Sequence, residues 1–265
     1  MRLKFIAILV LSILLMTACV NAPEEEIIVA GSTSVQPYAE ILAEEYERLH
    51  PGKGVDIQGG GSSAGITAAE SGVAEIGMSS RDLYEDERWL RHFEIARDGL
   101  AVIVHPDNPV DDLTLAQIRE IYSAAIKDWS EVGGPEGKIH LIAREEGSGT
   151  RGAFQDLVMD GVAITPRAII QDSNGAIRQL VAGDPRSIGF ISAGLVDETV
   201  KYVKLDGFAP TYQNLKNGSY QLYRPFLFVT DGWPEGLSKD FIDFTLSPEG
   251  QSMLIEEGLI SLMDD

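Results

Sequence analysis

Residues 143–152 have the sequence AREEGSGTRG, and this stretch decides the fold that we predict for the chain. It follows an apolar run at 139–143, typical of a buried strand, and precedes a segment typical of a helix. A chain that passes from a strand through a glycine-rich turn into a helix leaves backbone N–H groups unpaired where the helix dipole is positive. The stretch therefore predicts a site for a tetrahedral oxyanion. The candidate contributors are Arg144, Ser148, Gly149 and Thr150.

Three earlier strand ends also run into Ser- or Gly-rich turns that open helices. These turns are GSTS at 31–34, GGGSSAG at 59–65 and SSRD at 79–82. Ligands of open α/β sheets bind outside the carboxyl ends of the strands, where the helix N-termini point. A single such turn is explained by helix capping alone. Four of them, with arginines beside two, favour one shared site.

The composition is that of an ordinary globular protein with a strongly acidic balance. The chain has 265 residues and a formal net charge of −20, with 44% hydrophobic and 23% charged residues. Such a charge argues against nucleic acid and anionic membrane surfaces as partners. An anion site in this chain needs local donors, because the overall field repels its ligand.

The N-terminal segment resembles a lipoprotein export signal. Residues 1–18 form a basic start followed by an apolar run that is too short for a comfortable membrane span. Cys19 is the only cysteine, so a disulfide within the chain is impossible. We expect lipidation of Cys19, a tether over 19–26, and a protein held at the outer face of the cell membrane by its lipid alone. The alternative is an unmodified residue near an ordinary cleavage site, in a secreted or periplasmic protein.

Two long apolar strands, near 100–104 and 223–229, suggest two α/β units that are joined by a hinge. We predict one lobe over 27–103 plus 222–265 and a second lobe over 104–221. We also expect a charged helix around Trp89 and, at the C-terminus, helices interrupted at 247–250.

Four segments together resemble the phosphate-binding subunit of ABC-type phosphate importers. They are GSTSVQP at 31–37, GGSSAG at 60–65, IGMSSR at 76–81, and Arg144 with GSGTR at 147–151. The resemblance implies an α/β fold of the type II periplasmic-binding-protein kind, with a ligand cleft between two lobes. It also implies a monomer that captures inorganic phosphate for an ABC transporter permease, with no catalysis and no cofactor.

Carried over by motif, the resemblance implies a ligand set and several residues of less certain role. The ligands would be Ser34, Val35, Ser62, Ser80, Arg144, Ser148, Gly149 and Thr150. Residues at the ligand or its rim would be Thr33, Arg81, Asp82, Arg151 and Asn174. Structural alternatives stay open: Arg144 pairs with Glu145 or Glu146, Arg81 pairs with Asp82, and Asn174 belongs to a helix cap.

One departure from the family bears on selectivity. Long members have an aspartate after the third strand that accepts the proton of hydrogen phosphate, and this chain has Ser80 there. Either Asp82 substitutes, or the Ser80 hydroxyl accepts the proton itself. Sulfate, molybdate and tungstate therefore remain alternative ligands.

Two enzymatic alternatives are weaker. Gly147, Gly149 and Gly152 fit the GxGxxG dinucleotide motif, with Asp172 after the next strand, which suggests an NAD-linked oxidoreductase. The export signal and the other Ser/Gly turns argue against it. A hydrolase is disfavoured because no histidine neighbours a plausible nucleophilic serine in the sequence, and the four histidines are scattered without metal-ligand spacing.

Overall fold

The computed structural model describes residues 23–262. The predicted signal, Cys19 and most of the predicted tether lie outside the described residues. The tether ends earlier than predicted, because Glu25 and Glu26 already belong to the first strand. The backbone N–H of Glu24 anchors this start by donating to the carbonyl oxygen of Gly52 at 2.7 Å.

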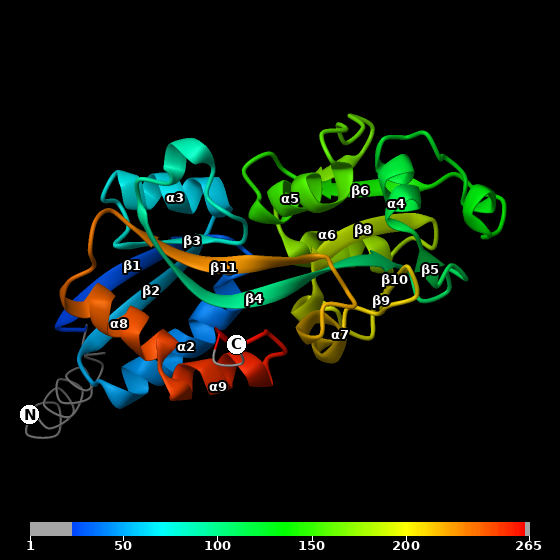
Figure 1. Ribbon diagram of the computed structural model, residues 1–265. Coiled ribbons are helices and arrows are strands. Elements are labelled where there is room, and N and C mark those ends of the chain that lie inside the picture. Colours follow the sequence, from blue (N-terminus) through cyan, green and yellow to red (C-terminus); the bar gives the residue numbers. More distant parts are fainter. Residues whose placement is uncertain (1–22, 263–265) are drawn as a thin grey trace, which may run out of the picture.

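The first lobe is built on three parallel strands with helices on both faces (Figure 1). Helix α2 places Tyr38, Leu42 and Tyr46 on one buried face, and Pro37 lies in its first turn, where a missing N–H costs nothing. The elements are β1 (Glu25–Gly31), α2 (Gln36–Leu49), β2 (Lys53–Gly59), α3 (Ser62–Glu70), β3 (Ile76–Ser79), α8 (Gly236–Leu246) and α9 (Pro248–Glu256). The interruption predicted at 247–250 is confirmed, since Ser247 ends α8 and caps α9.

The second lobe repeats this arrangement around β6, which is parallel to both β7 and β8. Its elements are β5 (Asp112–Leu113), α4 (Leu115–Tyr122), η2 (Trp129–Val132), β6 (His140–Arg144), α5 (Gly149–Phe154), the π-helix η3 (Gln155–Met159), β7 (Ile169–Gln171), α6 (Asn174–Ala182), β8 (Ser187–Ser192), η4 (Ala193–Leu195), β9 (Lys201–Tyr202), β10 (Lys204–Leu205) and α7 (Tyr212–Lys216).

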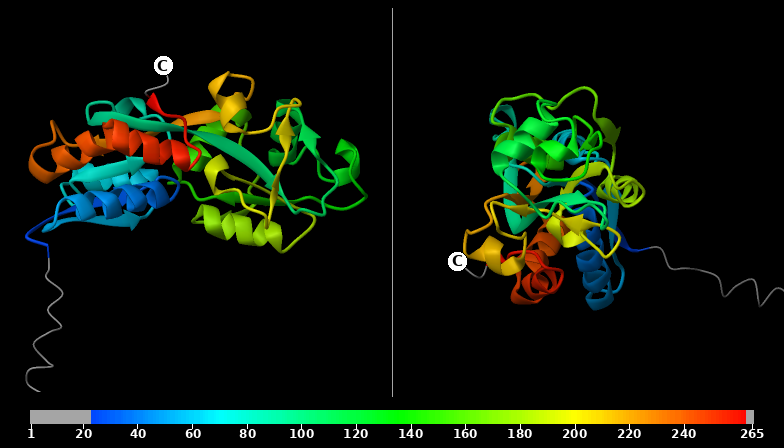
Figure 2. Two further views of the ribbon diagram at one scale, coloured as in Figure 1. Left: turned by 90° about the horizontal axis from the view of Figure 1, so that it is seen from below. Right: turned by 90° about the vertical axis from the view of Figure 1, so that its right-hand side faces the viewer.

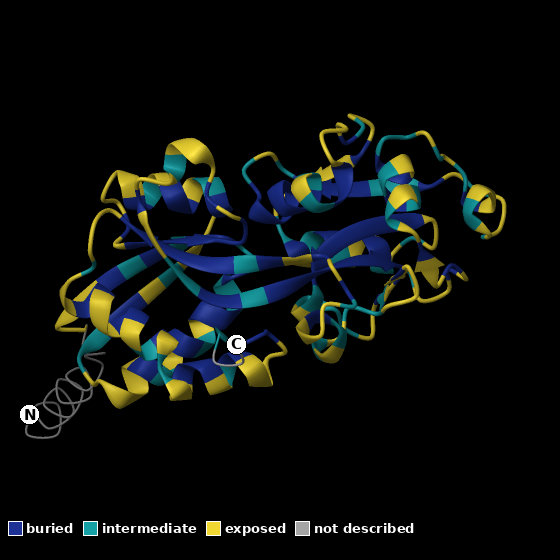
Figure 3. Ribbon diagram, viewed as in Figure 1, coloured by how far each residue is buried: buried dark blue, intermediate teal, exposed yellow. Residues whose placement is uncertain are grey.

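Two long antiparallel strands, β4 (Arg91–Val104) and β11 (Tyr223–Thr230), run from one lobe into the other (Figures 1 and 2). They join all the main strands into one nine-stranded sheet, in which eight strands have the order β2-β1-β3-β11-β4-β8-β6-β7 and β9 pairs with β4 beside this path. Their middle is mostly buried (Figure 3). In their register Arg224 lies opposite Asp98.

Each lobe has its own hydrophobic core. In the first lobe, aromatic residues of α2, β11 and α8 pack together around the parallel strands. In the second, Phe154 stacks on Phe190 with ring centroids 4.0 Å apart, and Tyr122 meets both rings edge-on. The turns that face each other across the two lobes are therefore each supported by the hydrophobic core of their own lobe.

The charged helix predicted around Trp89 is wrong. The chain forms only a short 3-10 turn, η1 (Glu85–Glu87), and β4 begins at Arg91 rather than near Leu100. The reason is local, because the Glu87 carboxylate accepts bonds from the Tyr84 N–H and from Arg81 and so closes a turn. No helix within residues 23–262 has the length and apolar character needed to cross a membrane.

The stacked pair in the second core gives a stability prediction. Phe190→Ala should lower the free energy of unfolding by about 3–5 kcal/mol, because it removes a fully buried ring and leaves a cavity. Phe208→Ala is the matched control, since that ring is 44% exposed, and it should cost less than about 1 kcal/mol. Urea denaturation measures both. Equal losses in the two variants would contradict this account of the core.

Candidate anion-binding site

Turns from both lobes meet at one buried cluster of polar side chains. The Oγ of Ser34 and the Oγ1 of Thr150 are 2.8 Å apart although 116 positions separate them in the sequence. The Ser63 N–H donates to the Gly147 carbonyl oxygen at 3.1 Å, and Arg144 donates to the Oγ1 of Thr33 at 3.1 Å. The Ser32 hydroxyl donates to the Oγ of Ser80 at 2.8 Å, so the four turns singled out in the sequence converge.

The cluster is shielded from solvent. Its buried polar residues include Ser34, Ser62, Ser80, Arg144, Ser148 and Thr150. Beside it an open groove between the lobes is lined by Thr33 and Gln36 from the first lobe and by Asn174 and Arg178 from the second. Buried hydroxyl and guanidinium groups need partners, so a dense polar cluster at the foot of a groove indicates a binding site.

Gly149 shows how closely the lobes approach. A Cβ at this position would lie within 2.6 Å of the Ser80 Oγ and closer still to the Ser62 Oγ, both of the first lobe. A Cβ at Gly152 would meet Arg81 at 2.9 Å and the Tyr84 hydroxyl at 3.0 Å. The glycines of the GxGxxG pattern therefore face the other lobe and not a dinucleotide.

Local hydrogen bonds position the first-lobe serines. The Ser32 Oγ accepts from the Ser34 N–H at 3.2 Å, which shapes the turn before α2. The Ser62 Oγ, at the start of α3, accepts from the Ser80 N–H at 3.0 Å. Two strand ends are thereby tied to each other, and their hydroxyl groups lie side by side.

Two predicted ligands are bonded within their own turns. The Val35 N–H donates to the Ser32 carbonyl oxygen at 3.1 Å. The Ser148 Oγ accepts from the Arg151 N–H and so caps α5. An anion would have to take over these groups by local adjustment.

Arg144 is 1% exposed and keeps one donor unused. Its Nε and Nη2 each donate to Glu145 at 2.9 Å, and Nη2 also reaches the Asp172 carbonyl oxygen. The Nη1 is buried without a hydrogen-bond partner among residues 23–262. Pairing with Glu145 therefore fixes the guanidinium and leaves the Nη1 amino group, with its two N–H bonds, available, an arrangement suited to an anion.

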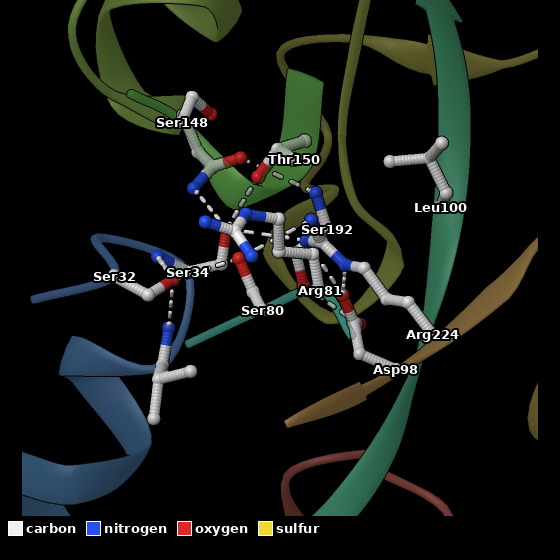
Figure 4. A network of polar contacts seen from close by, with 12 residues as sticks. Ser32, Ser34, Ser80, Arg81, Asp98, Leu100, Ser148, Thr150, Ser192 and Arg224 are labelled. Atoms are coloured by element: carbon white, nitrogen blue, oxygen red, sulfur yellow. Dashed lines mark hydrogen bonds and ion pairs between the residues drawn. The ribbon is translucent and has the colours of Figure 1, made fainter. Parts of the chain in front are cut away.

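A further buried arginine, Arg224, lies in the cluster and was not predicted from the sequence. Arg224 donates through Nη2 and Nε to one carboxylate oxygen of Asp98 at 2.9 and 3.1 Å, and the Ser192 hydroxyl donates to the other at 2.8 Å. Figure 4 shows this pair beside Ser34 and Ser80. Burial raises the pKa of Asp98 although Arg224 opposes the shift, and burial lowers the pKa of Arg224 although Asp98 opposes it. The sequence contained one signal for this pair. Asp98 and Arg224 are charged residues within apolar strands, and such groups are rarely buried unless they are paired.

Asn174 lies in the cluster and bonds to residues outside its own helix, so it does more than cap that helix. Its Nδ2 donates to the Ser34 Oγ at 2.9 Å, and its Oδ1 accepts from the Ser192 N–H at 3.3 Å. The side chain of Ser173 caps α6. Asp172 contributes only its carbonyl oxygen, to Arg144.

Three rim candidates lie outside the cluster. Arg81 is buried, pairs with Glu87 at 2.7 and 2.8 Å and stacks on Tyr84. Of the alternatives left open for it, a contact with Asp82 is present only as a bond to the backbone carbonyl oxygen at 2.8 Å. Asp82 is exposed and does not substitute for an aspartate in the site. Arg151 binds the Arg144 carbonyl oxygen and Glu146, both in its own lobe.

Comparison with known proteins agrees with this geometry. The model of the PBP superfamily domain matches residues 19–249. A phosphate-binding protein PstS of Bacillus subtilis is 31% identical over 244 residues, which cover 89% of this chain and 80% of that protein. The chain belongs to the PstS family. The resemblance stated from the sequence is thus confirmed.

Solved structures in the family share the fold. A putative phosphate ABC transporter substrate-binding protein from Clostridium perfringens, with bound phosphate, is 45% identical with a TM-score of 0.86, covering 89% of this chain and 99% of that one. An ABC-type phosphate transport receptor from Vibrio cholerae is 39% identical with a TM-score of 0.75, covering 88% and 99%. The predicted type II periplasmic-binding-protein fold is confirmed.

The contact at Gly149 yields a prediction. Gly149→Ala should weaken anion binding at least about tenfold, because the new Cβ would collide with Ser62 and Ser80 when the lobes close. Gly183→Ala is the matched control, as Gly183 is exposed at the end of α6, away from the groove, and its Cβ would come no nearer than 3.4 Å to any residue other than its chain neighbours. Titration calorimetry measures both affinities. Wild-type binding by Gly149→Ala would show that the lobes do not close here.

Proposed function

We propose that this protein captures inorganic phosphate outside the cytoplasm and delivers it to the permease of an ABC transporter. The observation that carries the proposal is the convergence of donors from both lobes on one buried point, where the Nη1 of Arg144 has no hydrogen-bond partner among residues 23–262. The PstS relatives and the phosphate-bound structure from Clostridium perfringens support phosphate as the ligand.

The proposed ligands are the predicted set enlarged by two residues. Ser34, Val35, Ser62 and Ser80 would hold the anion from the first lobe, and Arg144, Ser148, Gly149 and Thr150 from the second. Asn174 and Arg224 join them because both already donate to the Ser34 hydroxyl, at 2.9 and 3.2 Å. The anion would replace the direct contact between Ser34 and Thr150.

Closure of the two lobes over the anion would increase the affinity of the site. We take the lobes as 27–103 plus 222–265 and 104–221, with β4 and β11 as the hinge. Closing the groove excludes water, and each charge-assisted hydrogen bond is stronger in the resulting low dielectric. We expect capture without catalysis, and the site serines bond to hydroxyl, amide and guanidinium groups.

The cellular setting is part of the proposal. Export through residues 1–18 and acylation of Cys19 would hold a monomer at the outer face of the membrane, next to the permease. Phosphate and the permease are the partners, with no cofactor. Among residues 23–262 no cluster of His, Cys, Asp or Glu is arranged to hold a metal ion.

Arg144→Ala tests the site. It should weaken phosphate binding by about 2 kcal/mol or more, roughly thirtyfold, because it removes a buried charge-assisted donor. Arg186→Ala is the control, since its side chain is exposed and far less constrained. Calorimetric titration with phosphate decides. Unchanged affinity in Arg144→Ala would remove Arg144 from the ligand set, and no phosphate binding by the wild type would refute the function.

A further inference from the structure

The Ser34 hydroxyl has a fixed direction. Its oxygen accepts from the Nδ2 of Asn174 at 2.9 Å and from the Nη2 of Arg224 at 3.2 Å. A hydroxyl oxygen has two lone pairs, so both are in use. The proton of Ser34 must therefore be the one between it and Thr150, 2.8 Å away. Towards a ligand in that position Ser34 is a donor.

Ser80 is constrained in the same way. Its oxygen accepts from the Ser32 Oγ at 2.8 Å and from the Nη1 of Arg224 at 3.4 Å. The same guanidinium thus occupies a lone pair on each of two serines from different turns. The remaining contact of the Ser80 hydroxyl is with the Ser62 Oγ at 3.4 Å. Ser80, which stands where the sequence left a proton acceptor open, is therefore left only with a proton to give in that contact.

Carboxylates close to the cluster are equally occupied. Both oxygens of Asp98 are bonded, to Ser192 and to Arg224. Both oxygens of Glu145 are bonded by Arg144, and both oxygens of Glu87 by Arg81. Asp82 is exposed. Each of these paired carboxylates is thus held by another side chain, and among residues 23–262 none of the four carboxylates bonds to the hydroxyl of Ser34 or Ser80.

We propose that Arg224, held by Asp98, is a specificity-determining residue that makes Ser34 and Ser80 obligate donors, so that the site selects oxyanions by charge and disfavours every proton left on the ligand. The inference rests on the proposed function and sharpens it. Phosphate would bind as the dianion, and the monoanion, with its second proton, would be disfavoured. Sulfate, which has no proton, would compete with phosphate instead of being rejected.

Titration of the groups that face Arg224 does not imitate the weaker phosphate binding at low pH that follows from protonation of the ligand. These groups are Tyr38 from α2, Asp98 from β4 and Arg144 from β6. Burial raises the pKa of Tyr38, which keeps it neutral. Protonation of Asp98 on acidification would leave Arg224 without its counter-charge and would strengthen anion binding. That trend is opposite to the one expected from the protonation of phosphate.

Titration calorimetry of the purified protein with phosphate and with sulfate, at about pH 6 and about pH 8, tests the inference. Phosphate should bind about tenfold more weakly at the lower pH, because the dianion becomes scarce. Sulfate keeps both charges over this range and so reports any titration of the protein itself. The sulfate Kd should lie within about 100-fold of the phosphate Kd at the higher pH, whereas a site built to accept the ligand's proton discriminates about 10⁴-fold or more.

Two variants distinguish the proposed effect of Arg224 on selectivity from the loss of affinity that follows the removal of any donor. Arg224→Met combined with Asp98→Asn avoids a lone buried charge. The double variant should bind phosphate more weakly than the wild type. The ratio of its phosphate affinity at about pH 8 to that at about pH 6 should fall from about tenfold to below about threefold, because Ser34 and Ser80 can then accept a proton of the ligand in a hydrogen bond. Arg144→Met is the control. It should also lose affinity but keep the tenfold ratio, since Arg144 donates to Thr33, Glu145 and Asp172 and to neither serine.

The wild-type titrations decide even if the double variant does not fold. Equal phosphate affinity at both pH values after correction by sulfate, or a sulfate Kd more than about 100-fold weaker, would overturn the inference while leaving phosphate capture intact. Absence of phosphate binding at both pH values would overturn the proposed function, and the inference with it.

Discussion

The buried ion pair between Asp98 and Arg224 is the constraint on which the rest of the structure depends. The two side chains are 1% and 2% exposed and lie opposite each other in the two strands that join the lobes. Removing either partner would leave an uncompensated charge in the interior, at a cost of about 3–5 kcal/mol. The pair therefore fixes the register of β4 against β11. Because Ser192 of the second lobe completes it, hinge and site share the same residues.

A protein with a formal net charge of −20 has to attract an anion through groups at close range. The two arginines at the cluster, Arg144 and Arg224, do not supply bare charge, because Glu145 and Asp98 offset them. The attraction therefore comes from the orientation of N–H and O–H groups, which neighbouring residues hold with their protons directed at the anion site. Such preorganised donors cost little to reorganise when the ligand arrives.

The sequence predicts the parts of the fold and site that depend on local patterns. The strand–turn–helix units, the interruption at Ser247 and the convergence of the turns at 31–34, 59–65 and 144–152 follow from apolar runs and from Ser/Gly turns. Arg144 could be predicted because it lies beside such a turn. Arg224 could not, because its importance appears only once strand register places it opposite Asp98. The helix around Trp89 failed because a carboxylate, Glu87, folds back on Arg81 and closes a turn.

A crystal structure with phosphate would test the central claim most directly. The account predicts an anion within hydrogen-bonding distance of Arg144 from the second lobe and of Arg224 from the crossing strands, lying between Ser34 and Thr150. It also predicts that the ion pair with Asp98 stays intact. An anion bound by one lobe alone, or by neither arginine while Ser34 and Thr150 remain in direct contact, would contradict it.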